Sequence, residues 1–402
     1  MDRTCREHPK PVRGERSPHR SRRRHSDRET PRPSLNEVRR EESPTVRKLN
    51  QLAATTAAAG LLLAACSPSG ADSDTGNGDG GSGETLIVYT NSNADGRAEW
   101  LTAEAATAGF TIEVVGQGGG DTTNKILAEA NNPVADVVFG LNHVYFSQLV
   151  AADTIEPYTP SWSEEVDPAL GDPTGDGMYW PVVQQGIVLA YNADALAADE
   201  APTDWTDLWN DERFHGRYET VDGLGGATTQ LIFAGILTRY QDPDGDLGVS
   251  DEGWEQIQGY FEHGSPAVPD TDLYARMAAG DVDMGQMFTS GIPSREEEYG
   301  VTTGVVTPEF GVPFAVEQVA IVQGTDQTED AQAFIDWFGS ADVQAAWSAE
   351  FDSMPVNAGA IEQADASIVE FHAGLQQQDV DFEFVTENLS SWIEKVELEY
   401  VQ

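Results

Sequence analysis

The feature that most constrains the fold is an alternation of short apolar runs with amphipathic segments, beginning at Glu84. The runs TLIVYT, FTIEVVG and ADVVFG have the length and β-branched content of buried strands. The intervening segments ADGRAEWLTAEAAT and DTTNKILAEANN have helical periodicity, and the first places Trp100, Leu101 and Ala105 inward. Because parallel neighbouring strands need a crossover, which a helix supplies, this order predicts a doubly wound α/β sheet.

Polar loops follow the three expected strands. In a doubly wound sheet, ligands bind beyond the carboxyl ends of the strands, where helix N-termini present free N–H groups. The glycines of these loops fit neither GxGxxG nor a P-loop, so nucleotide binding is not supported. The loops are 91–93, 118–122 and 141–143.

A second α/β region follows the first. GIVLAYN and DVDMGQMF are predicted strands, a helix is expected from about 225 to Tyr240, and EQVAIVQG is a predicted return strand. Thr328 and Ser340 are then expected to cap two helices, the first with an apolar face. The C-terminal NLSSWIEKVELEYVQ repeats this spacing. The apolar residues of these two faces are Ala331, Phe334, Ile335 and Phe338, and Leu389, Trp392, Ile393 and Val396.

The chain before Glu84 has a different character. The apolar segment 52–65 has the length of a signal-peptide core, and LAAC, ending at Cys66, resembles a bacterial lipobox. We therefore expect a signal peptide at 46–65, a lipidated Cys66 and a flexible tether at 66–83. Residues 1–45 are interpreted as a disordered leader or an over-extended start, with a nucleic-acid-binding tail as the alternative.

The charge balance constrains the partners. Residues 66–402 contain 8 Lys and Arg against 60 Asp and Glu, a net charge of −52, which argues against nucleic acid and anionic membrane surfaces. Because the acids are scattered, we predict a surface adapted to high salt. The only other cysteine, Cys5, lies in the leader, so no disulfide and no cysteine-based metal site is expected. No cofactor is expected either.

Catalysis is not expected. Residues 66–402 contain four histidines but no HExxH, GxSxG or SxxK pattern, which makes a secreted hydrolase the weaker hypothesis. DPDGDLGVSDEG, starting at Asp242, has three aspartates spaced as in an EF-hand loop. However, Leu247 stands where glycine is needed and Gly253 where glutamate is needed. A solvated turn with Ser250 capping the next helix is the better interpretation.

Four segments together resemble a known family. EQVAIVQGTDQTEDAQAFIDWFGSADVQAAW, with TLIVYTNSN, ADVVFG and GIVLAYN, is similar to bacterial extracellular solute-binding proteins of family 1. The closest group serves ABC importers for ferric iron, thiamine, phosphonates and sugar phosphates, and the resemblance covers about 84–357. It implies a two-lobed type II periplasmic-binding-protein fold, each lobe a mainly parallel sheet flanked by helices, with the ligand cleft between the lobes.

The resemblance also implies a role and a domain order. A monomeric lipoprotein, anchored to the membrane through Cys66, would capture a small-molecule solute outside the cytoplasm and deliver it to ABC permease and ATPase subunits. A sensor for a membrane receptor is the alternative with the same fold. With crossovers near 181–187 and 310–318, residues 84–184 begin the first lobe and 185–310 form the second. Residues 311–402 hold the return to the first lobe and the C-terminal helices.

Two ligand classes can be judged by the side chains that each would require. Ferric-binding members of this group usually place two adjacent tyrosines after the strand that corresponds here to DVDMGQMF. This chain has Phe288-Thr289-Ser290-Gly291 at that position, so iron through the usual site is not expected. Thiamine would need an aromatic clamp and an acid, for which Tyr145 and Glu317 are available.

The favoured ligand is a small phosphorylated or phosphonate metabolite. Three expected helix starts, at 91–95, 225–229 and 290–294, offer backbone N–H groups to a tetrahedral anion, and Arg97 and Arg295 lie in or beside them. The alternative is that Asn91, Thr228 and Ser290 only cap helices and that both arginines pair with surface acids. The candidate ligand-binding residues are Asn91, Ser92, Asn93, Arg97, Gly119, Gly120, Asp121, Thr122, Asn142, His143, Gln185, Gly226, Ala227, Thr228, Thr229, Thr289, Ser290, Arg295 and Glu317.

Overall fold

The computed structural model describes residues 84–221 and 223–401. The predicted leader, signal peptide, lipidated Cys66 and tether lie outside these residues. Within them, no helix combines the length and apolar character that crossing a membrane requires.

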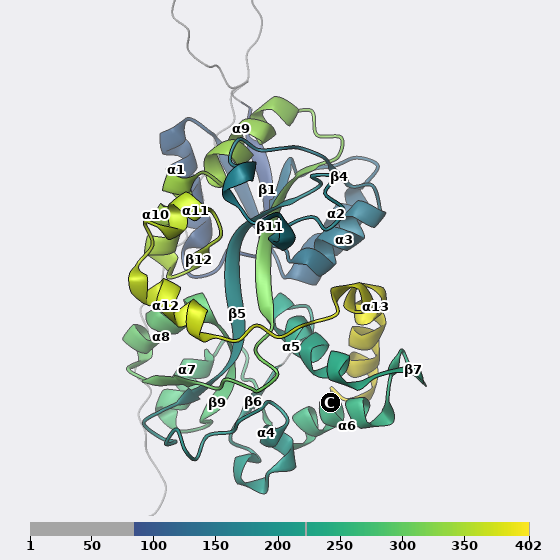
Figure 1. The fold of residues 1–402 in the computed structure, drawn as a ribbon, viewed down its shortest axis with the longest axis vertical. Coiled ribbons are helices and arrows are strands. Elements are labelled where there is room, and N and C mark those ends of the chain that lie inside the picture. Colours follow the sequence, from purple (N-terminus) through teal and green to yellow (C-terminus); the bar gives the residue numbers. More distant parts are fainter. Residues whose placement is uncertain (1–83, 222, 402) are drawn as a thin grey trace, which may run out of the picture. The chain divides into compact units, whose positions relative to one another are not determined.

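The first α/β region has the predicted order of elements. Strand β1 (Leu86–Thr90) lies between β2 (Ile112–Gly116) and β3 (Val137–Phe139), and both pairings are parallel. Helix α1 (Arg97–Ala108) connects β1 to β2, and α2 (Gly119–Glu129) connects β2 to β3. Leu101 and Ala105 are fully buried as predicted, whereas Trp100 is half-buried and packs edge-on against Trp347. Figure 1 shows α1 on one side of this sheet and α2 with α3 (His143–Ala151) on the other.

Two long strands run through both halves of the molecule. Residues 180–186 of β5 (Trp180–Asn192) pair antiparallel with β11 (Phe314–Val322), and residues 187–191 pair with β9 (Met284–Phe288). Strand β11 pairs further along with β3. These strands join the two halves, and they overlap the crossover segments expected at 181–187 and 310–318. Figure 1 shows them side by side down the middle of the fold.

The second lobe is built around the far half of β5. Its ladders with β9 and with β10 (Thr303–Val305) are antiparallel, so the expectation of a mainly parallel sheet is wrong for this part. The reason is that β5 enters directly from the first lobe, without the helical crossover that makes successive strands parallel. Parallel pairing is kept between β6 (Glu219–Thr220) and β8 (Ser265–Pro266). The helices of this lobe are α4 (Asp207–Asn210), α5 (Ala227–Leu237), α6 (Asp251–His263), α7 (Leu273–Ala279) and α8 (Ile292–Tyr299).

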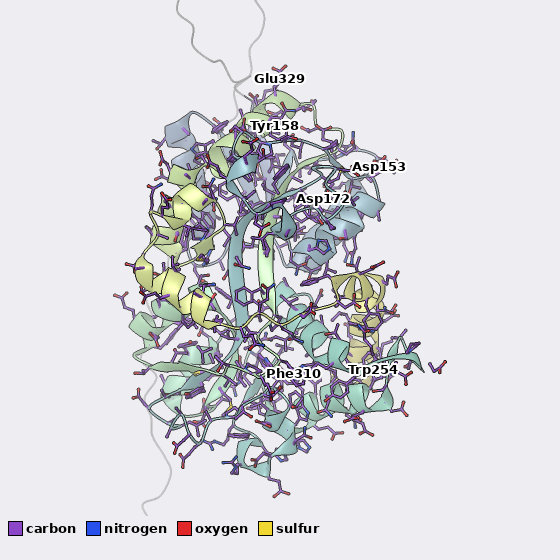
Figure 2. All side chains as sticks on the ribbon, viewed as in Figure 1. Asp153, Tyr158, Asp172, Trp254, Phe310 and Glu329 are labelled. Atoms are coloured by element: carbon purple, nitrogen blue, oxygen red, sulfur yellow. The ribbon has the colours of Figure 1, made fainter. Side chains whose placement is uncertain are left out.

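Short elements complete these two regions. The strands are β4 (Ile155–Glu156) and β7 (Gln241–Asp246). The 3-10 turns are η1 (Ser163–Glu165), η2 (Pro168–Leu170), η3 (Glu212–Phe214), η4 (Thr238–Tyr240) and η5 (Thr289–Gly291). Strand β7 lies in the segment that has EF-hand-like spacing, and Ser250 caps α6 by accepting the Gly253 N–H, as predicted. Exposed acids such as Asp153 and Glu329 project from the surface (Figure 2).

The return segment packs on the first lobe. The predicted apolar face of α9 (Thr328–Phe338) is buried against residues of β1, β3 and β11. Two capping predictions need correction. Gln327, rather than Thr328, occupies the N-cap of α9, and Ser340 occupies the N-cap of α10 (Ala341–Phe351) although its side chain accepts no N–H group there. Strand β12 (Met354–Pro355) and helices α11 (Ala358–Ile361) and α12 (Ala366–Gly374) follow.

The C-terminal helix α13 (Phe382–Glu399) belongs to the core of the second lobe. Its residues Leu389, Trp392 and Val396 are buried in one cluster with side chains of α5 and α6, and the predicted Ile393 packs at the edge of that cluster. Helix α13 also contacts α3 of the first lobe. It is therefore joined to both lobes (Figure 1).

Candidate functional site

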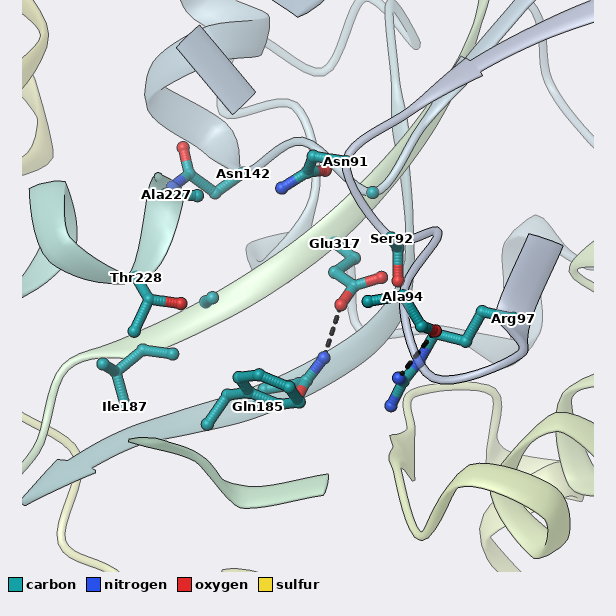
Figure 3. Close-up of a pocket in the computed structure, with 13 residues that line it drawn as sticks. Asn91, Ser92, Ala94, Arg97, Asn142, Gln185, Ile187, Ala227, Thr228 and Glu317 are labelled. Carbon is teal, nitrogen blue, oxygen red and sulfur yellow. Dashed lines mark hydrogen bonds between the residues drawn. The ribbon is translucent and has the colours of Figure 1, made fainter. Parts of the chain in front are cut away.

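A cavity of about 130 Å³ lies between the two lobes. Both crossover strands form its floor, and loops or helix ends from each lobe form its walls (Figure 3). The first lobe contributes Asn91, Ser92, Ala94, Arg97, Gly140 and Asn142; the crossovers contribute Gln185, Ile187, Ala315 and Glu317; the second lobe contributes Ala227, Thr228 and Phe288.

Direct contacts between the lobes accompany this cavity. The Gly120 N–H donates to the Gly225 carbonyl at 3.4 Å, and the Tyr145 hydroxyl donates to Gln230 Oε1 at 2.6 Å. Elsewhere Arg97 donates to Ser290 Oγ at 3.0 Å. These contacts join residues far apart in the chain, so the structure represents the lobes closed on each other.

The N-terminus of α5 opens into the cavity without a side-chain cap. Its N-cap is Gly226, whose lack of a side chain leaves the first-turn N–H groups uncapped, and Ala227 and Thr228 line the cavity. First-turn N–H groups have no intrahelical acceptor, and the helix dipole is positive at this end. Asn142, on the facing wall, caps α3 through Oδ1 and keeps its amide N–H groups for a ligand. This end of the cavity is therefore suited to an anion.

A chain of hydrogen bonds runs along the opposite wall. Arg97 Nη2 donates to Ser290 Oγ, which donates to Gln185 Oε1 at 2.7 Å, and Gln185 Nε2 donates to Glu317 Oε1 at 2.5 Å. Arg97 is buried and also donates to the Asp95 carboxylate at 3.1 Å. Its guanidinium carbon lies 4.8 Å from the centre of the Phe351 ring. The arginine is thus held in place by the protein.

Glu317 is a buried acid, and one of its carboxyl oxygens has no hydrogen-bond partner among the described residues. Burial raises the pKa of its carboxyl, and the nearby positive charge of Arg97 opposes that rise. Oε1 accepts from Gln185, whereas Oε2 has no hydrogen-bond partner among the described residues. The Ser92 hydroxyl lies beside the carboxyl and also opposes the rise in its pKa (Figure 3). Asn91 Oδ1, on the same wall, is also buried without a partner in the described part of the chain.

Several predicted site residues lie away from the cavity. Gly119 packs against the Tyr145 ring, and Gly120 and Asp121 line a separate pocket with residues of α13. His143 contacts the Tyr179 hydroxyl at 2.7 Å, and Thr289 contacts His372. The others that do not line it are Asn93, which packs beside Gly116; the buried Thr122 and Thr229; the N-cap Gly226; and Ser290, which lies behind Gln185.

The alternative interpretation of the polar residues is wrong in one part and right in another. Asn91, Thr228 and Ser290 do not cap helices, because the N-caps of α1, α5 and α8 are glycines and no described side chain accepts an N–H group at these helix starts. Both arginines, however, pair with acids as that interpretation expects: Arg97 with Asp95 at 3.1 Å, and Arg295 with Asp272 at 2.9 Å and with Asp95 at 3.3 Å. Arg295 does not line the cavity. Its expected role as an anion contact is not supported.

The residues missed at the sequence level are mostly apolar. Ala94, Gly140, Ile187, Phe288 and Ala315 line the cavity. They have no chemistry that marks a site in a sequence, although each lies within a few residues of a predicted one. In the described ranges, no group of three or more His, Cys, Asp or Glu is arranged to hold a metal ion.

The chain is similar to known transport proteins. A family model described as "Bacterial extracellular solute-binding protein" matches residues 102–371. A probable ABC transporter periplasmic-binding protein, y4fP of Sinorhizobium fredii, is 33% identical over 352 residues, which is 88% of this chain and 93% of that protein. A putative 2-aminoethylphosphonate-binding periplasmic protein of Salmonella typhi is 24% identical over 272 residues, 65% of this chain and 75% of that protein.

A solved structure shows the same fold. Iron-bound HitA from Pseudomonas aeruginosa superposes with a TM-score of 0.66 at 20% identity, covering 78% of this chain and 99% of that one. The likeness confirms the two-lobed fold predicted from the sequence.

Proposed function

Because the chain belongs to the bacterial extracellular solute-binding proteins, we propose that it captures a small phosphorylated or phosphonate metabolite for an ABC importer. The observation that carries the ligand class is the uncapped N-terminus of α5 at the cavity between the lobes. A tetrahedral anion there would accept the N–H groups of Ala227 and Thr228 and the Asn142 amide. The name of the Salmonella typhi relative supports a phosphonate.

The size and lining of the cavity support a small cargo. Its volume of about 130 Å³ is below the range of about 300–1,000 Å³ typical of pockets for larger ligands. The lining residues in the described chain include no tyrosine, so a ferric ion would lack the tyrosinate oxygens expected of an iron site. Phe288 is their only aromatic ring, which disfavours a thiamine clamp.

We further propose that the mature protein is a monomer held at the membrane through a lipid on Cys66. The lipobox-like LAAC supports the anchor, and the polar stretch 66–83 would give a reach of about 23 Å as a flexible coil. The relatives are transport proteins rather than enzymes, and the proposed partners are a permease and its ATPase.

The test begins with a thermal-shift screen in molar KCl against phosphonates, sugar phosphates, thiamine and ferric chelates. A hit among the first two classes is then titrated calorimetrically against Ala227→Pro. Proline is tolerated at the first helical position and removes one N–H donor, and the extended Gly226 (ψ 133°) suits a following proline. We expect affinity to fall about tenfold or more, the value of a hydrogen bond to a charged group.

The matched control is Ala366→Pro, at the exposed first position of α12 after Asp365 with ψ 130°. It makes the same substitution away from the cavity and should bind like the parent. Parent-like affinity in Ala227→Pro would contradict the anion site. Hits confined to thiamine or ferric chelates would contradict the proposed ligand class.

A further inference from the structure

The two ends of the cavity differ in chemistry. The α5 end offers N–H donors, whereas the wall that holds Asn91 and Glu317 contains two buried oxygens, Asn91 Oδ1 and Glu317 Oε2, that have no hydrogen-bond partner in the described chain. Glu317 is only 6% exposed, and its Oε2 has no partner in the described chain. A buried polar atom without a partner costs free energy that a ligand with N–H groups can recover.

The protein supplies no ion pair to Glu317. All eight Lys and Arg of residues 66–402 lie in the described part, and each forms an ion pair with another acid. Arg97 is the one whose charge acts on Glu317, but its hydrogen bonds go to Ala94, Asp95 and Ser290. The other side chains that act on the carboxylate, Gln185 and Ser92, are neutral.

Apolar side chains lie between the two ends. Ile187, Ala315 and Phe288 line the cavity, and Figure 3 shows Ile187 beside Thr228, with Glu317 and Ser92 farther along. A short aliphatic chain would bury against these residues without leaving a polar group unpaired. Along the cavity, N–H donors at the α5 end are thus followed by apolar side chains and then by acceptor oxygens.

We propose that the ligand is a zwitterion: a short aminoalkyl phosphonate or phosphate whose primary ammonium donates to Glu317 and Asn91. Its anionic group lies at the N-terminus of α5, so this inference rests on the proposed function. Glu317 is then the residue that selects for an amine, and Asn91 supplies a second acceptor. The linker between the two charged groups is a few carbon atoms long.

The first experiment varies the ligand and leaves the protein unchanged. Calorimetry in molar KCl compares 2-aminoethylphosphonate with n-propylphosphonate, in which a methyl group replaces the ammonium at nearly equal size, and phosphoethanolamine with propyl phosphate. We expect each amine to bind about tenfold or more tightly than its partner. Equal binding within the pairs overturns the ammonium site and leaves the proposed function standing. No binding of any of the four compounds overturns the zwitterion, and the thermal-shift screen against sugar phosphates and other phosphonates then decides the proposed function.

The second experiment varies the residue. Glu317→Gln keeps the shape and an acceptor for Gln185 but removes the charge. The ratio of the affinities for 2-aminoethylphosphonate and n-propylphosphonate should therefore fall toward one, while n-propylphosphonate still binds. Asp352→Asn is the matched control: it removes an acid that also acts on Arg97, does not line the cavity, and suits the positive φ of 50° there. A preference kept in Glu317→Gln, or lost in Asp352→Asn, overturns the assignment. If Glu317→Gln fails to fold, the ligand pairs still decide.

Discussion

Replacing Gly140 by alanine tests whether the backbone after β3 is shaped by the cavity. Gly140 has φ +91°, in the left-handed region that disfavours side chains, and its N–H donates to the Gln318 carbonyl. A Cβ at this position would lie 2.8 Å from Asn91 Oδ1 and 2.9 Å from Thr90 Oγ1. Both distances are too short for real contacts, so the Asn91 side chain or the loop must shift.

The expected loss of stability has two parts. The left-handed conformation costs about 1–2 kcal/mol for a residue with a side chain. Overpacking a filled site adds about 1–3 kcal/mol. The free energy of unfolding of Gly140→Ala should therefore fall by about 2–5 kcal/mol, measured by urea denaturation in molar KCl.

A second glycine separates the two parts. Gly175 has φ +74° and nothing within 4 Å of a built Cβ, so Gly175→Ala should lose only the backbone part, about 1–2 kcal/mol. Because Asn91 lines the cavity, Gly140→Ala should also weaken binding of the best ligand, whereas Gly175→Ala should bind like the parent. Equal destabilisation of the two variants, with parent-like affinity in Gly140→Ala, would refute this reasoning.

Three further predictions concern acid, salt and processing. Burial lowers the pKa of His372 from 6.5 to about 4. Between pH 6.5 and pH 4, His372 is therefore protonated in the unfolded chain but stays neutral in the folded chain. This contribution to stability is present above pH 6.5 and is lost as the pH falls toward 4. In His372→Gln, the decrease in the free energy of unfolding between pH 7 and pH 4.5, measured by urea denaturation, should be smaller than in the parent by up to about 3 kcal/mol. An equal decrease in the two proteins would contradict this prediction. The melting temperature of the parent should rise as KCl goes from low to molar concentration, and a flat or falling curve would argue against salt adaptation. Mass spectrometry of protein extracted from its native membrane should find a lipidated Cys66 at the N-terminus, and recovery of any peptide from residues 1–45 would exclude that processing.

The order and type of the main elements could be predicted because local patterns encode them. The apolar runs that became β1, β2 and β3, and the spacing of Phe334 and Phe338 on α9, are periodic over a few residues and need no knowledge of distant contacts. The cavity was partly predictable for a related reason. Ligand sites of α/β sheets lie beyond strand ends, and this rule found Asn91, Ser92 and Asn142.

The rest depended on contacts between residues far apart in the chain. Only the tertiary structure turned Gly119 toward Tyr145 and Arg295 toward Asp95 and Asp272, because an arginine in so acidic a chain has many possible partners. Only the folded arrangement left Glu317 Oε2 without a donor, since its surroundings come from β1, β5 and η5 together. Sequence fixes which groups can donate, accept or carry charge; which of them meet is decided by the packing of the two lobes, because the energy of a polar group depends on the partner that burial leaves it.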